Sequence, residues 1–165
     1  GPGQHEVELR REGGGAPLRY SLVARWSALV PTSSPGCKVA LTTRLARAEV
    51  REGEAVDVRV ELENRTDEGL PMTVAVVGLP GGLEARADQL KELVAEGRVD
   101  AFELRGREVV LYRRHMPPRA RDVVDLSVLA AVPGTYAGPA SRAYLYYTDE
   151  HKVWTDPLSV RVLPS

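Results

Sequence analysis

Apolar and polar residues alternate along most of this chain, which is the pattern of strands that bury one face and expose the other. The clearest run is residues 56–62, in which valine or leucine at every second position alternates with a charged residue. Similar runs occur at residues 39–45, 124–130 and 158–162, and turn sequences rich in Gly, Pro, Asn and Asp lie between them. About seven to nine strands at intervals of roughly 8–15 residues predict an all-β fold, an antiparallel β-sandwich.

One segment breaks the alternation and predicts a single short helix. In residues 88–97, Leu90, Leu93 and Val94 have the i, i+3, i+4 spacing of one helical face. The aspartate that opens the segment is a favoured N-cap residue, and the glycine that closes it is a favoured C′ residue. A helix this short is marginal alone, so we expect it to dock on a sheet.

The N-terminal part of the chain has its own pattern. Residues 7–9 and 18–30 alternate, and the glycine-rich segment 13–17 separates them, which predicts a β-hairpin. Because an isolated hairpin with an apolar face is unstable, we expect it to pack on the sandwich or on a second copy. Residues 31–36, Pro-Thr-Ser-Ser-Pro-Gly, predict a flexible linker and a domain boundary.

Charge and hydropathy argue against two classes of partner. The chain has 165 residues, with 22 Lys+Arg, 23 Asp+Glu and a net charge of -1. A near-neutral chain does not favour nucleic-acid binding, and Asp122 and Asp125 dilute the arginine-rich stretch 105–121. The sequence contains no long apolar run, so we expect no membrane insertion.

Candidate chemistry is sparse. The single cysteine, Cys37, cannot form a disulfide framework or a cysteine-rich zinc site. The three histidines have no i, i+4 partners and are best interpreted as surface residues: His5, His115 and His151. The acidic segment 148–151 with Asp156 could bind calcium, but its oxygen spacing is less regular than calcium loops require. We therefore expect no catalytic residue, no metal and no cofactor, and predict that the chain is not an enzyme.

One ordered set of segments is more specific than any single motif. Gly-Leu-Pro-Gly-Gly-Leu-Glu at residues 78–84 precedes the predicted helix, and Val-Pro-Gly-Thr-Tyr-Ala-Gly-Pro-Ala at residues 132–140 precedes the tyrosine-rich segment 144–150. This order resembles the C-terminal receptor-binding domain of the alpha-2-macroglobulin family of protease inhibitors, a β-sandwich with one helix. The resemblance assigns residues 38–163 to that domain. It assigns residues 4–32 to the C-terminal part of a CUB-like β domain, whose sheet would supply the hairpin.

The resemblance implies a non-catalytic role in a larger inhibitor. Family members are cut in a bait region and enclose the protease, and many tether it through a thioester that would lie upstream. Cys37 lacks the thioester sequence pattern. The implied partners are the other domains of a broad-spectrum endopeptidase inhibitor, the trapped protease indirectly, and a surface receptor. The implied type is bacterial, and the implied location is extracytoplasmic, either periplasmic, cell-surface or secreted.

The predicted helix carries the candidate interaction surface. In vertebrate members a receptor recognises two lysines four residues apart; Lys91 corresponds to the second, but the first position is Ala87. The broken pair disfavours that type of clearance and leaves Arg86, Lys91 and Arg98 as the candidate surface.

Two alternative functions remain open from the sequence. One is an immunoglobulin-like structural or adhesion module of a cell-surface protein, although such modules rarely contain a helix. The other is a small carbohydrate- or calcium-binding domain, for which Trp26 and Trp154 provide few aromatic platforms.

Overall fold

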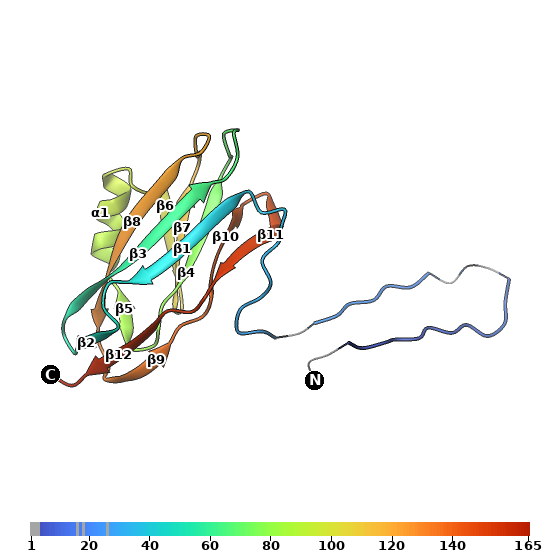
Figure 1. Cartoon of the computed structure of the whole chain (residues 1–165), viewed down its shortest axis with the longest axis horizontal. Coiled ribbons are helices and arrows are strands. Elements are labelled where there is room, and N and C mark those ends of the chain that lie inside the picture. Colours follow the sequence, from blue (N-terminus) through green and yellow to red (C-terminus); the bar gives the residue numbers. More distant parts are fainter. Residues whose placement is uncertain (1–3, 16, 18, 26) are drawn as a thin grey trace.

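The computed structural model describes residues 4–15, 17, 19–25 and 27–165. Its main body is a β-sandwich flanked by one helix (Figure 1). The first sheet has the strand order β1 (Val39–Leu45), β3 (Ala55–Asn64), β8 (Arg121–Ala130), β5 (Leu83–Ala85). The second has the order β11 (Thr148–Thr155), β10 (Ser141–Leu145), β4 (Thr73–Gly78), β7 (Glu108–Arg113), β6 (Ala101–Arg105).

A smaller sheet lies at the end of the sandwich where the chain terminates (Figure 1). It has the order β2 (Glu49–Arg51), β12 (Ser159–Leu163), β9 (Gly134–Ala137). β2 and β12 run parallel, whereas the other pairs of named strands are antiparallel. The predicted fold class, an all-β antiparallel sandwich with one short helix, is confirmed.

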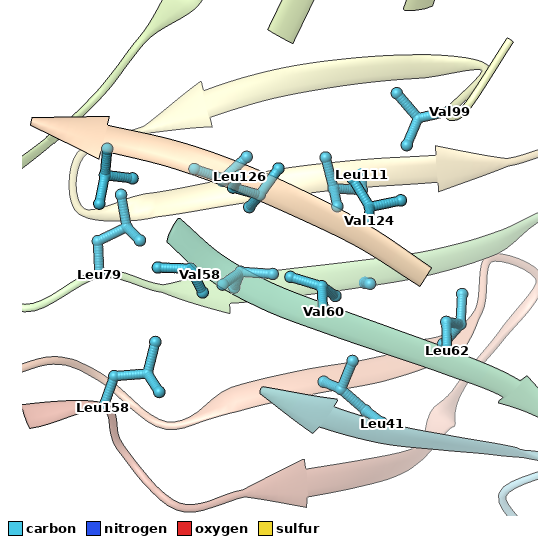
Figure 2. Close-up of a cluster of buried hydrophobic side chains, with 14 of the residues drawn as sticks. Leu41, Val58, Val60, Leu62, Leu79, Val99, Leu111, Val124, Leu126 and Leu158 are labelled. Atoms are coloured by element: carbon cyan, nitrogen blue, oxygen red, sulfur yellow. The ribbon is translucent and has the colours of Figure 1, made fainter. Parts of the chain in front are cut away.

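The alternating residues of the two long strands build the core. Val58 and Val60 of β3 lie beside Leu126 and Val124 of β8 in register, and all four are buried (Figure 2). The charged residues between them face solvent, as their alternation predicts. The apolar face of the β3–β8 pair therefore forms one wall of the core.

Strand β4 departs from the alternating pattern because both of its faces are buried. Ala75 and Val77 belong to the main core, whereas Val74 and Val76 form a second cluster with Val110 on the opposite face. The rings of Tyr112 and Tyr144 pack against that second cluster. A strand covered on both faces has a continuous apolar sequence instead of an alternating one.

Helix α1 (Ala87–Ala95) is the predicted helix, but it begins two residues earlier than Asp88 as the N-cap predicts. Its N-cap is Arg86, and Asp88 lies in the first turn instead of capping it. Gly97, at φ +70°, ends the helix: its N–H donates to Val94 O and the N–H of Arg98 donates to Leu93 O. This pair of bonds is the Schellman arrangement, for which glycine is favoured. α1 contacts β8 of one sheet and β6 of the other, so it closes that side of the sandwich around the buried Leu90.

The predicted N-terminal hairpin is not formed in the described residues. Between residues 4 and 30 these residues belong to no strand or helix, and the segment extends away from the sandwich (Figure 1). Its apolar side chains are exposed, for example Tyr20 at 72% and Leu22 at 67%, so it does not pack on the sandwich, which was one of the two expected arrangements. Two strands without a third strand or a second layer bury too little apolar surface to be stable. Part of the predicted alternation, Leu18 and Trp26, lies outside the described residues.

The segment 31–36, which was predicted to be a flexible linker, is partly ordered in the structure. Residues 34–37 form a turn closed by a hydrogen bond from Cys37 N–H to Ser34 O, and Ser34 N–H donates to Lys152 O of β11 at 2.8 Å. The C-terminal half of the Pro/Ser/Gly segment is therefore attached to the sandwich. Within this segment, Ser33 and Ser34 are the residues that are hydrogen-bonded to β11.

Candidate interaction surfaces

The structure ties two of the three predicted surface residues to neighbouring groups. Arg86 pairs with Asp88 at 2.9 Å, and Arg98 donates from Nη2 to the Val123 carbonyl of β8 at 2.6 Å. Gln89 donates similarly to the Asp125 carbonyl at 3.0 Å. β5 pairs with β8 only at residues 128–130, so no strand hydrogen-bonds to these two carbonyls from that side. The side chains of Arg98 and Gln89 supply the donors that a neighbouring strand would otherwise provide.

Lys91 is exposed, and no hydrogen bond or ion pair is found for its side chain in the described part of the chain. It shares the exposed part of α1 with two carboxylates, Glu92 and Glu96. Including Arg86, Asp88 and Arg98, the helix and its flanks carry equal numbers of basic and acidic side chains. This surface has no net charge that would select an acidic or a basic partner.

The two segments that carry the family resemblance meet in the fold. The ring of Tyr136 in β9 packs over Gly81 and Gly82, and its hydroxyl donates to the Pro133 carbonyl at 2.9 Å. A side chain at Gly82 would collide with this ring, and Gly82 also has φ +81°, which favours glycine. The tyrosine of one segment therefore requires the glycines of the other.

A second contact between these segments lies at the end of β4. A Cβ at Gly78 would collide with the Pro139 carbonyl oxygen, and the N–H of Gly78 donates to Ser141 Oγ at 3.0 Å. Gly138 also lies close to backbone: a Cβ there would be 2.9 Å from Leu79 C and from Pro80 N. The two segments that carry the resemblance therefore form a packing joint, residues 78–82 against residues 133–141, which connects β4, β9 and β10. The role of this packing joint is to stabilise the fold.

Beside this joint lies a hollow of about 440 Å³. It lies between β5, the 79–82 loop, residues 131–132 and the β6–β7 turn, and its apolar lining includes Leu79, Leu83, Leu104 and Val132. Glu108, the half-buried acid of the lining, is held by Arg142 at 2.6 Å. The hollow is an apolar groove between edge strands of the two sheets.

A tyrosine pair forms a second exposed feature that the sequence did not single out as a site. Tyr146 and Tyr147 occupy the β10–β11 turn, 51% and 75% exposed, with ring centroids 5.2 Å apart. They line a hollow of about 390 Å³ whose wall includes Glu103 and Tyr112. The tyrosine-rich segment 144–150 was the signal that the sequence offered for this feature.

The wall of that hollow is held by charged hydrogen bonds. Tyr112 donates from its hydroxyl to Glu103 at 2.8 Å, and Arg105 donates to the same carboxylate at 2.7 Å. These bonds lower the pKa of Glu103. Burial, together with the bond to Glu103, raises the pKa of Tyr112. The carboxylate therefore remains ionised and engaged with its own neighbours at neutral pH.

Other sequence features have structural partners. Most arginines of the 105–121 stretch pair with acids: Arg113 with Asp122, Arg119 with Asp67, and Arg121 with Glu61. Asp149 of the acidic segment pairs with Lys152 in β11. Within the described residues, no group of three or more His, Cys, Asp and Glu side chains could hold a metal ion. None of the described helices is long and apolar enough to cross a membrane.

Solved structures of bacterial alpha-2-macroglobulins share this fold. Trypsin-activated alpha-2-macroglobulin from Escherichia coli matches with a TM-score of 0.66 at 16% identity, over 84% of this chain and 11% of its own. A mutant of Salmonella alpha-2-macroglobulin gives a TM-score of 0.64 at 18% identity, over 81% of this chain and 10% of its own. An Escherichia coli fragment from domain MG7 to the C-terminus gives 0.59 at 18% identity, over 79% of this chain and 25% of its own. No family model and no curated protein matches the sequence.

The comparison defines the fold class: a β-sandwich with one helix, of the kind found in bacterial alpha-2-macroglobulins. The resemblance inferred from the sequence is confirmed at the level of the fold. This chain spans about a tenth of the length of the longer chains that it matches and a quarter of the fragment.

Proposed function

We propose that this chain is the C-terminal region of an alpha-2-macroglobulin-like, broad-spectrum endopeptidase inhibitor, and that it is an interaction and conformational-change module and not a catalyst. The observation that carries the proposal is the fold match to bacterial alpha-2-macroglobulins, which includes a fragment ending at the C-terminus. On this proposal, residues 38–163 form the receptor-binding-type domain. The trapped protease is an indirect partner, and the location is extracytoplasmic.

The N-terminal segment supports the same proposal. Residues 4–32 have strand-type alternation, yet the described ones leave their apolar side chains exposed. Such a segment is stable when its strands join a larger sheet. We therefore assign residues 4–32 to a CUB-like domain whose remaining strands precede this chain.

The surfaces described above are suited to contacts with other domains. The tyrosine turn exposes two aromatic rings, and tyrosine is enriched in protein interfaces. The helix surface of Arg86, Lys91 and Arg98 is the further candidate; a receptor would have to recognise it without the paired lysines of vertebrate members. The closure of the sandwich by α1 disfavours the alternative of a plain immunoglobulin-like adhesion module.

A trapping experiment tests this function on the full-length protein that contains the chain. The protein is mixed with trypsin or elastase, and residual protease activity is measured on a large protein substrate and on a small peptide substrate. A trap that encloses the protease suppresses cleavage of the large substrate and spares the small one. Equal activity on both substrates, with and without the protein, would contradict the proposal.

A further inference from the structure

The segment that leads into the sandwich is attached to an edge strand by side chains. Trp154 N–H of β11 donates to Ser33 Oγ at 2.9 Å, where a β-ladder would place a backbone carbonyl. Ser34 Oγ shares a 2.9 Å hydrogen bond with His151 Nδ1. The single backbone hydrogen bond from this segment to β11 is that from Ser34 N–H to Lys152 O.

The segment is also preorganised for this position. Ser34 Oγ accepts a hydrogen bond from Gly36 N–H at 3.2 Å, and Cys37 N–H closes the turn on Ser34 O. Gly36 lies so close to the His151 ring that a Cβ there would be 3.1 Å from it. Cys37 packs against the core and fixes the far end of the segment.

We propose that residues 33–37 form a releasable strap that docks on β11 and sets the direction in which the chain leaves the sandwich. The bonds that hold the strap are few and exposed, and such elements open at low free energy without unfolding of the body. Cys37 remains anchored when the strap opens, so the released length is short. Release also uncovers Lys152 O and Trp154 N–H on the edge of β11, where another strand could pair.

The strap connects two features that are far apart in the sequence. On its N-terminal side is the exposed segment 4–30, and β11 begins at Thr148, directly after the tyrosine turn. Displacement of the preceding segment therefore acts on β11, the strand that directly follows Tyr146 and Tyr147. This link deepens the proposed conformational role, but the strap itself can be tested in this chain without a protease.

Amide hydrogen exchange tests the strap, with Ser33→Ala and His151→Ala as variants and His115→Ala as the matched control. His115 is also exposed, but it lies beside Gly69, away from the strap. Loss of one exposed hydrogen bond is expected to accelerate exchange of the Ser34 amide about fivefold in each variant. Exchange in β3 remains unchanged, and the control leaves Ser34 unaffected.

A distance measurement tests whether the strap sets the direction in which the chain leaves the sandwich. Spin labels at Leu29→Cys and Ser127→Cys, in a Cys37→Ser background, report how the preceding segment is oriented relative to the first sheet. We expect a broader distance distribution in the Ser33→Ala/His151→Ala protein than in the parent. An unprotected Ser34 amide in the unmodified chain, unchanged exchange in both variants, or equally broad distributions would overturn the strap. A failed trapping experiment, by contrast, would overturn only the proposed function.

Discussion

At the scale of single residues, Asn64 is the most completely bonded polar side chain. It is fully buried; its Nδ2 donates to the carbonyls of Glu68 at 2.7 Å and Pro117 at 2.8 Å, and its Oδ1 accepts from Thr66 N–H at 2.9 Å. The Asn-Arg-Thr sequence matches a glycosylation acceptor, but its amide is inside the fold. The motif can be read from the sequence, but the buried hydrogen bonds of the Asn64 side-chain amide can be seen only in the structure.

We predict that Asn64→Ala lowers the free energy of unfolding by about 3 kcal/mol, because several backbone groups lose their partner in a buried site. Chemical denaturation measures this change. The neighbouring exposed Glu63→Ala is the control and should change stability by less than about 0.5 kcal/mol. Equal stability of the two variants would show that the Asn64 bonds contribute little.

The nearby pair of Asp67 and Arg119 predicts a pH dependence. Arg119, which holds an unusual φ of +55°, donates to Asp67 from Nε at 2.7 Å and from Nη2 at 3.0 Å. These bonds, and the positive charge, lower the pKa of Asp67. A carboxylate with a lowered pKa in the folded state stabilises the fold above its ordinary pKa, and this contribution disappears as the pH falls through the lowered value.

Unfolding of the parent and of Asp67→Asn should therefore differ most near neutral pH. The two stability curves should converge in acid, once Asp67 is protonated in the folded chain. Because the pair is exposed, the difference is small and decreases with added salt. Curves that remain parallel down to acidic pH would mean that the ion pair is not the cause of the difference.

At the scale of secondary-structure elements, the period of the apolar residues was the reliable signal. The alternation of residues 56–62 identified β3, and the spacing of Leu90, Leu93 and Val94 identified α1 to within two residues at its start. The sequence pattern did not show that both faces of β4 are buried, and it did not show the turn at Tyr146 and Tyr147. Those features depend on what packs against the segment, which a local pattern does not contain.

The candidate site was less predictable than the fold. Arg86, Lys91 and Arg98 lie on or beside α1 and remain a predicted interaction surface, and the hydrogen bond from Arg98 to Val123 depends on how short β5 is. The strap was predicted as a free linker because Ser, Pro and Gly are typical of both linkers and ordered turns. Its docking partner lies more than a hundred residues later in the sequence.

The packing joint between β4, β9 and β10 predicts the effect of Gly78→Ala. The added methyl group would meet the Pro139 carbonyl, which belongs to the backbone and cannot rotate away. We expect a loss of about 3 kcal/mol in the free energy of unfolding, measured by denaturation. Gly15→Ala is the control, since nothing lies near that position, and comparable losses in both variants would disprove the steric explanation.

At the scale of the whole molecule, the exposed N-terminal segment tests the proposal that this chain belongs to a larger inhibitor. Leu22 is 67% exposed, so Leu22→Glu should leave the stability of this chain unchanged. If residues 4–32 complete a CUB-like sheet in the parent, the same substitution places a charge against a buried face there and lowers stability by about 2–3 kcal/mol. Thermal unfolding of both proteins makes the comparison, and no effect in the parent would contradict the CUB-like assignment.

The central proposal is that this chain belongs to a larger protease inhibitor, in which residues 38–163 move as a rigid module when a protease cuts it. Cryo-electron microscopy of the full-length protein before and after reaction with trypsin tests it most directly. We predict that the sandwich and α1 keep their internal structure while the domains in contact with them change. The claim would be contradicted if residues 38–163 kept the same neighbouring domains and the same orientation before and after cleavage.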